Sequence, residues 1–373
     1  MSAAALQSAT GTGVSTVHAI GSRRLGGAER FFARLVRALH GTGAPTLAVV
    51  RRGSELARML PPVPVVETGM RNGADVLTAW RIRRIVQSDR PQIVQTYLGR
   101  ASRLTRVPRR SETVHVARLG GYYRPNSYRH ADAWIGNTRG ICDYLVRTGF
   151  PADRVFHIGN FAEAMDAPCT PEQRSGARAA LSLPADALLI FSLGRFVRKK
   201  GFEDLLHAFA LLPAEVDARP LHLVVAGDGA MRAELRALTE RLDISARVHW
   251  PGWQHDPAPF YRAADVFVCP SRDEPLGNVV LEAWAHGLPV VATRAAGPTE
   301  LIDDGANGLL THIGAPQAMS GAIHRLLEAD EAERNAMGKA GLELVRTTYS
   351  ETAIVASYLQ VYDVLANELG RRR

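Results

Sequence analysis

The chain has 373 residues, of which 46% are hydrophobic and 22% are charged. This composition is typical of a folded globular protein and excludes a disordered one, and the length predicts two domains because it exceeds what one ordinary core accommodates. The formal net charge of +8 is uneven, since residues 1–165 hold 24 Arg, no Lys and 10 acidic residues, whereas residues 166–373 hold 21 basic and 27 acidic residues.

The net charge of the first half, 24 − 10 = +14, predicts an anionic partner. We do not expect that partner to be nucleic acid, because the sequence shows no zinc-ligand spacing, no RNA-binding aromatic signature and no single dense run of arginine. An anionic membrane surface, or an acceptor that carries phosphates, is favoured. The alternative is that arginine is simply frequent in this organism's proteins, although the second half does not share the excess.

The three cysteines, Cys142, Cys169 and Cys269, are far apart and have no metal-ligand spacing, which favours a reduced compartment. No segment approaches the roughly 20 apolar residues of a membrane span. The N-terminus lacks the ordered basic, apolar and cleavage segments of a signal peptide. From these patterns we expect a cytoplasmic protein that works at the inner face of the cytoplasmic membrane.

Residues 14–20 read as a first strand, residues 21–27 as a glycine-containing turn and residues 28–40 as an amphipathic helix. A strand, a glycine turn and a helix in that order open a doubly wound α/β domain. The same alternation continues, with strands at 46–50, 63–66, 93–96, 113–116, 133–136 and 154–158 and helices at 75–87 and 138–147. This order predicts a parallel sheet covered by helices.

The first half contains two candidate sites. Gly26 and Gly27 precede the first helix, where the absence of side chains lets a ligand approach the backbone and the helix N-terminus favours an anion. A plain tight turn is the alternative. His115 lies in the strand predicted at 113–116, and a lone histidine in a strand is more often structural than catalytic.

Residues 162–185 contain several prolines and are predicted to link the first domain to a second. The apolar strand at 187–193 ends in Gly194 and Arg195, and Lys200 follows a few residues later. Arg195 and Lys200 can bind an anion such as a phosphate group. The alternative is a pair of solvated bases in a surface loop.

The second half continues as alternating strands and helices. The turn Gly227-Asp228-Gly229 follows a strand at 221–226 but lacks the third glycine of a dinucleotide fingerprint, since Arg232 stands at that place. This disfavours an NAD-dependent oxidoreductase. The other predicted elements are a strand at 248–252, a helix end and strand within 261–270, and helices at 231–242, 316–328, 331–345 and 352–369.

The stretch from 274 to 293, EPLGNVVLEAWAHGLPVVAT, predicts a loop, a helix that Asn278 can cap, and a buried strand. The N–H groups of Gly277, Asn278 and Val279 then lie at a helix N-terminus, where a phosphate is favoured. Glu274 before the helix and Glu282 within it can accept hydrogen bonds from hydroxyl groups on either side of that phosphate. The alternatives are a plain turn and, for Glu282, compensation of the helix dipole.

This stretch resembles the Glu-x7-Glu donor signature of the retaining GT-B glycosyltransferases of family 4, the group 1 type. In that family the first Glu, here Glu274, meets hydroxyls of the transferred sugar. The intervening amides hold the diphosphate, and the second Glu, here Glu282, binds the ribose. Gly194-Arg195 with Lys200-Gly201 is similar to the family's Gly-Arg and Lys-Gly motif, which also holds the diphosphate.

The resemblance is looser in the first half. Gly26-Gly27-Ala28-Glu29-Arg30 is similar to the family's Gly-Gly-x-Glu-Arg opening, which lies beside the donor diphosphate and the acceptor. The family also often places a histidine at a strand end facing the transferred sugar, and His115 would take that position. The resemblance therefore implies four catalytic residues, which are Glu274, His115, Arg195 and Lys200.

The fold that the resemblance implies is GT-B, an α/β fold of two Rossmann-like doubly wound domains facing across a cleft. Residues 1–165 are expected to form the acceptor-side domain, joined by a C-terminal helix at 352–373, and residues 166–351 the domain that binds the nucleotide sugar.

The resemblance also implies a retaining transferase that moves a sugar from a nucleotide-diphosphate sugar to a glycan. The sequence has no Asp-x-Asp and no other metal spacing, so we expect no metal and no cofactor beyond the donor substrate. With the basic first half, the expected acceptor is a lipopolysaccharide core or another anionic cell-envelope saccharide or glycolipid, reached by peripheral contact with an anionic membrane. The alternatives are a GT-B nucleotide-sugar epimerase, a transferase with a soluble acceptor, and an inactive nucleotide-sugar-binding subunit.

Overall fold

The computed structural model describes residues 13–23, 25–108, 111–166 and 169–371. It divides the chain into two compact units, unit 1 (Met1–Phe161 with Glu351–Arg373) and unit 2 (Ala162–Ser350). The predicted boundary at residue 165 lies a few residues beyond this division. Residues 372 and 373 of the predicted C-terminal helix, and 167 and 168 of the predicted linker, lie outside the described residues.

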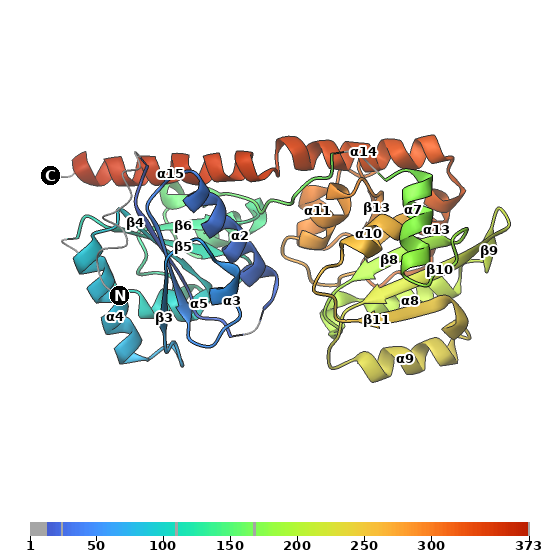
Figure 1. Ribbon diagram of the computed structural model, residues 1–373, viewed down its shortest axis with the longest axis horizontal. Helices are drawn as coiled ribbons and strands as arrows, with labels where there is room; N and C mark the ends of the chain where they lie inside the picture. The colour runs from blue at the N-terminus through green and yellow to red at the C-terminus, as the bar shows by residue number, and fades with distance from the viewer. Residues whose placement is uncertain (1–12, 24, 109–110, 167–168, 372–373) are drawn as a thin grey trace. The chain divides into compact units, whose positions relative to one another are not determined.

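Unit 1 is built on a parallel sheet in the order β3-β2-β1-β4-β5-β6-β7 (Figure 1). Its strands are β1 Thr16–Ile20, β2 Thr46–Arg51, β3 Val65–Thr68, β4 Ile93–Tyr97, β5 Val114–Leu119, β6 Ala133–Gly136 and β7 Val155–His157. Its helices are α2 Gly27–Gly41, α3 Leu56–Met59, α4 Val76–Asp89, α5 Leu98–Leu104, α6 Arg139–Arg147 and α15 Glu351–Arg371, with short 3-10 turns η1 Pro125–Ser127 and η2 Ala152–Arg154.

The order of the strands in unit 1 reverses between β1 and β4. Residue Thr16 at the start of β1 pairs with Thr46 on one side and Ile93 on the other, and Ile20 pairs with Val50 and Tyr97, so the three strands end at the same edge. In an open α/β sheet ligands bind at the carboxyl edge where the strand order reverses. This edge of β1 and β4 is therefore the expected ligand-binding edge of unit 1.

Helices cover both faces of this sheet because its strands are apolar on both sides. On one face Ile82 and Val86 of α4 pack with Val17 of β1 and Val94 of β4. On the other face α2 packs with α15, the C-terminal helix, which contributes a row of buried side chains, Ile354, Val355, Tyr358, Tyr362 and Leu365. The last helix of the chain thus completes the core of unit 1.

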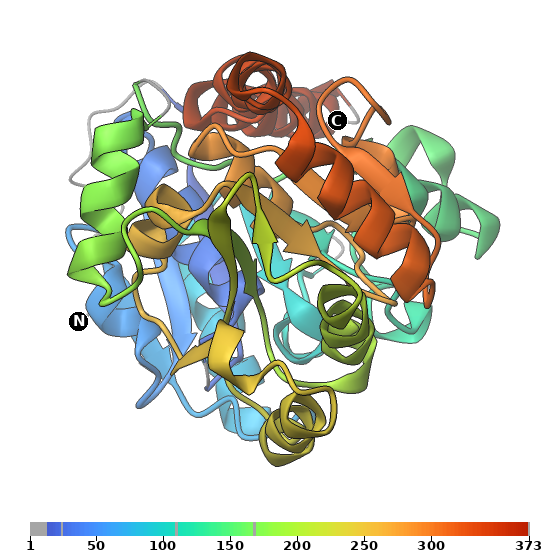
Figure 2. The ribbon, with the colours of Figure 1, turned by 90° about the vertical axis from the view of Figure 1, so that its right-hand side faces the viewer.

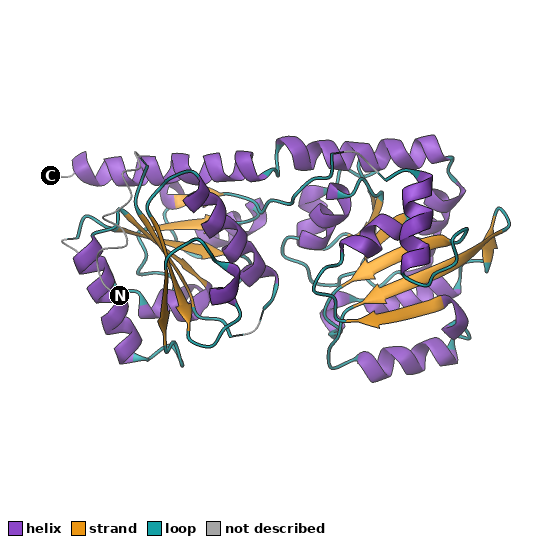
Figure 3. Cartoon of the chain, in the orientation of Figure 1, coloured by secondary structure: helices purple, strands orange, loops and turns teal. Residues whose placement is uncertain are grey.

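Unit 2 contains a second parallel sheet in the order β11-β10-β8-β12-β13-β14, with β9 added antiparallel to β10 (Figure 3). Its strands are β8 Leu188–Leu193, β9 Glu215–Val216, β10 Arg219–Ala226, β11 Val248–Gly252, β12 Val266–Cys269, β13 Val290–Thr293 and β14 Leu309–Thr311. Its helices are α7 Pro171–Ala180, α8 Phe202–Ala210, α9 Arg232–Arg241, α10 Ala258–Ala263, α11 Asn278–Ala285, α12 Ala296–Leu301, α13 Pro316–Glu328 and α14 Glu331–Thr347, with 3-10 turns η3 Arg198–Lys200 and η4 Ser245–Arg247.

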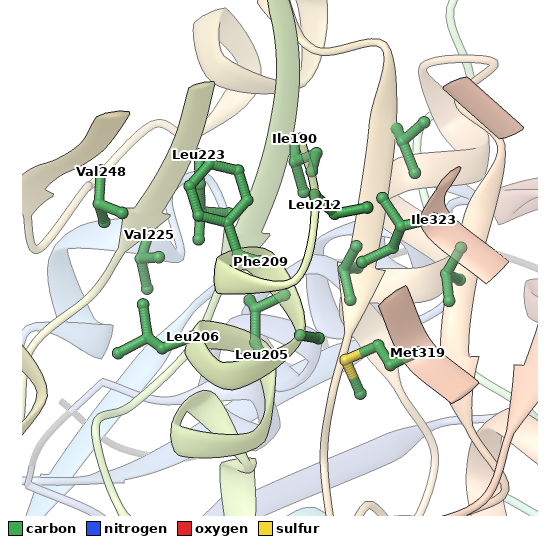
Figure 4. Close-up of a cluster of buried hydrophobic side chains, with 14 of the residues drawn as sticks. Ile190, Leu205, Leu206, Phe209, Leu212, Leu223, Val225, Val248, Met319 and Ile323 are labelled. Carbon is green, nitrogen blue, oxygen red and sulfur yellow. The ribbon is translucent and has the colours of Figure 1, made fainter. Parts of the chain in front are cut away.

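The second sheet is also covered on both faces. Helices α8, α9 and α13 lie on one side, and α7, α10 and α11 pack on the other (Figure 2). Figure 4 shows side chains of α8, such as Leu206 and Phe209, pointing toward Leu223 and Val225 of β10. This close packing on both sides holds β8 and β12 side by side, and the strand order reverses between them.

Three local predictions need correction. Helix α7 lies inside the segment predicted as a linker, because Thr170 and Gln173 form a reciprocal capping box that starts it. Strand β5 continues to Leu119, beyond the predicted end at 116. Helix α11 begins at Asn278, so Gly277 with φ +92° is its N-cap and Asn278 does not cap it.

Candidate active site

The predicted diphosphate-binding residues follow β8, and Glu274 follows β12, at the carboxyl edge of unit 2 where the strand order reverses. The register is fixed by Val266 against Ile190 and Phe267 against Phe191. The hydroxyl of Ser192, near the end of β8, donates a 2.8 Å hydrogen bond to the carbonyl oxygen of Val268 on β12. Two loops of the chain are thereby held next to each other.

Gly201 sets how closely these loops approach. Its φ is +67°, a conformation that favours glycine, and a Cβ added there would lie 1.9 Å from the carbonyl oxygen of Pro270. The loop is also fixed by Arg272, whose guanidinium group donates two 2.7 Å hydrogen bonds to the carboxylate of Asp204 on α8. Neither Arg272 nor Asp204 was predicted to have a role in the site, although both are charged residues adjacent to predicted motifs.

Lys200 and Glu274 form the central contact of the site. The Lys200 ammonium group donates a hydrogen bond to the Glu274 carboxylate, and the same carboxylate oxygen accepts one from the Ser271 hydroxyl at 3.2 Å. Only 17% of the Lys200 side chain and 12% of the Glu274 side chain are exposed. Burial opposes the charge of Lys200, but the neighbouring Glu274 carboxylate more than offsets it, so the pKa of Lys200 is raised.

Arg195 lies on the same edge but remains exposed. Its side chain forms no hydrogen bond or ion pair with any residue that the structure describes. Its charge lies close enough to Lys200 to oppose the protonated form there. An exposed guanidinium group beside a buried ammonium group is a suitable arrangement for an anion with several oxygens. The structure therefore brings Arg195, Lys200 and Glu274 together.

Helix α11 directs its N-terminus to this edge. No side chain caps it at Gly277, and the first N–H groups of a helix have no acceptor within the helix. The carbonyl oxygen of Glu274 accepts a 2.8 Å hydrogen bond from the N–H of Gly297, which holds the loop before the helix. Gly277, Asn278 and Val279 thus lie where the sequence places an anion-binding helix start.

Glu282 lies within α11 and is oriented by residues that sequence reasoning missed. The hydroxyl of Tyr261, a fully buried side chain of α10, donates a 3.0 Å hydrogen bond to its carboxylate. The Tyr261 ring stacks on the His286 ring at 4.9 Å between centroids, and the Nδ1 atom of His286 lies 2.8 Å from the Glu282 carbonyl oxygen. Burial and the Glu282 carboxylate both raise the pKa of Tyr261, so the phenol stays a donor.

The remaining predicted site residues belong to unit 1. Gly26 is the N-cap of α2 and Gly27 its first residue, immediately after the loop that leaves β1. A Cβ at Gly26 would lie 2.9 Å from a carboxylate oxygen of Glu29, which is buried in the first turn of α2. The two glycines therefore lie at the ligand-binding edge of unit 1.

The structure does not support the catalytic role predicted for His115. Because β5 continues to Leu119, His115 lies near the amino end of its strand, away from the edge where ligands bind. It is 1% exposed, its Nε2 atom lies 2.9 Å from the Thr96 hydroxyl, and burial lowers its pKa to about 3. His115 is a neutral residue of the core.

Among the described residues, no group of three or more His, Cys, Asp or Glu side chains could hold a metal ion. In the same part of the chain, no helix is both long enough and apolar enough to cross a membrane.

Comparison with known proteins identifies the family. Residues 25–164 match the family model described as Glycosyltransferase Family 4, and residues 173–343 match that of Glycosyl transferases group 1. The chain is 36% identical over 340 residues to the lipopolysaccharide core biosynthesis glycosyltransferase LpsE of Rhizobium meliloti (strain 1021), covering 90% of this chain and 95% of the relative. The chain belongs to the group 1 glycosyltransferases.

A second relative and two solved structures are also similar to this chain. LpsD of the same organism, also named a lipopolysaccharide core biosynthesis glycosyltransferase, is 34% identical over 342 residues, 91% of this chain and 95% of LpsD. The crystal structure of Anabaena Alr3699/HepE in complex with UDP and glucose matches with a TM-score of 0.80 at 20% identity, over 94% of this chain and 99% of that one. WaaG, a glycosyltransferase involved in lipopolysaccharide biosynthesis, matches with a TM-score of 0.70 at 16% identity, over 93% and 99%. The predicted GT-B fold and glycosyltransferase activity are confirmed.

Proposed function

We propose that this glycosyltransferase moves a sugar, with retention of its anomeric configuration, from a nucleotide-diphosphate sugar to an anionic cell-envelope saccharide such as a lipopolysaccharide core. The observation that carries the donor assignment is the cluster of Arg195, Lys200 and Glu274 beside the N-terminus of α11. The names of LpsE and LpsD support the acceptor, and the UDP and glucose bound to the Anabaena protein support the donor class.

The cluster can perform the two tasks that transfer requires. Before the donor binds, Lys200 is paired with Glu274. A diphosphate that arrives at Arg195 and the α11 N-terminus competes for Lys200, which frees the Glu274 carboxylate to accept hydrogen bonds from hydroxyls of the sugar. As the bond to the sugar breaks, Arg195, Lys200 and the helix dipole stabilise the new phosphate charge. We infer from these three sources of positive charge that transfer does not require a divalent ion.

Retention is inferred from family membership. In the step that we propose, the acceptor hydroxyl attacks the anomeric carbon from the face that the diphosphate leaves. The carbon–oxygen bond to the diphosphate breaks, and the departing phosphate oxygen takes the hydroxyl proton. No side chain is assigned as the base. Glu282, held by Tyr261, would bind the ribose hydroxyls of the donor.

The test combines a donor screen with an assay of the product. A panel of nucleotide sugars is first screened by thermal shift, because a ligand that binds only the native state raises its melting temperature. Transfer of the selected sugar to lipopolysaccharide core is then measured with and without EDTA, and the anomeric configuration of the product is read by NMR. Epimerisation of the donor without transfer, inversion, or full activity of Glu274→Ala would each contradict the proposal.

We also propose that the enzyme contacts an anionic membrane through α4. Three of its large apolar side chains are exposed within one and a half turns, Val76 by 77%, Leu77 by 76% and Trp80 by 54%. The opposite face of α4 is buried in unit 1 through Ile82 and Val86. The exposed face continues with three exposed arginines, Arg81, Arg83 and Arg84. An exposed apolar segment followed by arginines is the pattern of a helix that lies in the interface of an anionic bilayer, such as a cytoplasmic leaflet.

Co-sedimentation with vesicles tests this contact. We expect binding to vesicles that contain phosphatidylglycerol and not to phosphatidylcholine alone, with a decrease at high salt. Leu77→Ser combined with Trp80→Ser should lower the affinity at least tenfold, whereas Leu211→Ser combined with Ile313→Ser, two exposed apolar residues of unit 2, should not. Equal binding by both double variants would contradict the assignment. The wild-type protein could instead fail to bind vesicles and form a dimer that only the α4 substitutions dissociate. That result would identify this face as a protein interface.

A further inference from the structure

A cavity of about 560 Å³ lies at the ligand-binding edge of unit 1. It is lined by residues that follow three adjacent strands, namely Gly21 and Ser22 after β1, Arg51 at the end of β2, and Leu98 after β4, together with Arg23 and Arg100. The strand order reverses between β1 and β4, so the cavity occupies the position where open α/β sheets bind their ligands. None of its residues was predicted from the sequence to belong to a site.

The lining is cationic. It contains three arginines and no acidic residue, and no ion pair joins Arg23, Arg51 or Arg100 to a carboxylate among the described residues. Arginine presents a planar fork of N–H donors that matches the oxygens of a phosphate or carboxylate. The cavity therefore has positive charge that the described part of the protein does not neutralise.

Arg100 is held in place before any ligand binds. Its Nη1 atom donates hydrogen bonds to the carbonyl oxygens of Gly21, at 2.8 Å, and of Met70, at 3.2 Å. Its aliphatic part lies along Gly21, where an added Cβ would come within 3.0 Å of the Arg100 Cδ atom. Both acceptors are neutral, so they orient the guanidinium group without cancelling its charge.

The backbone at this edge is also unusual. Leu98, directly after β4, has φ +64°, in the left-handed region that a leucine rarely adopts because it is strained there. Such residues persist where the surrounding structure enforces them, and they are frequent at ligand sites. This feature agrees with a ligand site, although the charge and position of the cavity carry the inference.

We propose that this cavity binds a phosphate group of the acceptor saccharide through Arg23, Arg51 and Arg100. The inference rests on the proposed function and adds to it the chemical class that the acceptor must carry. A cavity of about 560 Å³ has room for a phosphate together with the sugar that bears it. Arg52 provides a matched comparison, because it is the next residue in the chain, is exposed, and does not line the cavity.

Binding of glucose 6-phosphate, glucose, inorganic phosphate and UDP to the full-length enzyme tests the proposal by thermal shift and calorimetry. We expect glucose 6-phosphate to bind and glucose not to bind. Arg23→Gln combined with Arg51→Gln should lower the affinity for glucose 6-phosphate at least tenfold, whereas Arg52→Gln should not. The affinity for UDP should be the same in the wild-type enzyme, in the double variant and in Arg52→Gln.

Three outcomes would overturn the proposal. Glucose could bind with the same affinity as glucose 6-phosphate, or the Arg23 and Arg51 substitutions could leave the affinity for glucose 6-phosphate unchanged. Loss of glucose 6-phosphate binding in Lys200→Met instead would place the phosphate in unit 2. A failure of the proposed transferase function would give a different result. UDP would then not bind, whereas the combined Arg23 and Arg51 substitutions would still weaken the binding of glucose 6-phosphate.

Discussion

Lys200 and Glu274 are hydrogen-bonded to each other across two loops, and both charged groups are largely removed from solvent. Each charge compensates the other, because Glu274 is the single ion-pair partner of Lys200 among the described residues, and the other donor to the Glu274 carboxylate is the neutral Ser271 hydroxyl. The pair is therefore both a structural element of unit 2 and the group that a donor must rearrange.

A double-mutant cycle tests this relationship. Lys200→Met or Glu274→Gln alone leaves a mostly buried charge unpaired, and each should lower the free energy of unfolding by about 3 kcal/mol. The double variant should lose less than the sum of the two because no unpaired charge remains. Urea unfolding measures this coupling, and additive losses would show that the two groups do not interact. Each single variant should also lower kcat about 100-fold or more, because we propose that Lys200 acts on the leaving group and Glu274 on the sugar.

Tyr261→Phe should weaken donor binding without removing Glu282. The substitution deletes the hydroxyl that orients the Glu282 carboxylate, and a hydrogen bond to a charged group contributes about 1.5–3 kcal/mol. We expect KM for the nucleotide sugar to rise about tenfold or more, with a smaller change in kcat. Tyr144→Phe is the control, because the Tyr144 hydroxyl donates a comparable hydrogen bond to the Tyr123 carbonyl oxygen in unit 1. An equal rise in KM for both variants would refute a specific role of Tyr261.

Deletion of residues 351–373 should unfold unit 1 and spare unit 2. Helix α15 buries five large side chains in the core of unit 1, and each contributes roughly 1.5–3 kcal/mol, so their sum is comparable with the whole stability of an ordinary domain, about 5–15 kcal/mol. Arg118, buried in β5, also loses the Tyr358 hydroxyl that accepts its hydrogen bond at 2.9 Å. Calorimetry of the truncated chain should retain one cooperative transition, and limited proteolysis should assign it to unit 2. In the full-length chain, Val364→Ser, at an exposed position of α15, should leave the unfolding transitions of unit 1 and unit 2 unchanged.

Stability should decrease as the pH falls below about 6.5. Burial lowers the pKa of both His18 and His115 to about 3, so below pH 6.5 the unfolded chain binds protons that the native chain does not. The loss should be about 2 kcal/mol for each histidine at pH 5 and should approach its limit near pH 3. Urea unfolding at pH 7 and pH 5 measures it. His115→Leu should reduce the pH dependence, whereas His207→Gln, at an exposed position, should not; equal slopes in all three proteins would contradict the burial argument.

Local sequence patterns were sufficient to predict most of the fold. Apolar runs predicted the strands β1, β8 and β12, and the alternation with helices predicted parallel sheets, because strand and helix formation depends on residues close together in the chain. The spacing of Glu274 and Glu282 around a helix start was predicted for the same reason. The group 1 motifs then led to the family that the comparisons confirmed.

Contacts between residues far apart in the chain were decided only by the tertiary structure. Lys200 meets Glu274 across 74 positions and Arg100 meets Gly21 across 79, so no local pattern predicts either pair. The sequence placed His115 at a strand end, but the pairing of β5 with β4 and β6 extended the strand and buried the histidine. The amino-acid pattern determined which elements form, whereas the order of strands in each sheet decided which side chains share an edge, because that order brings together the ends of strands distant in sequence.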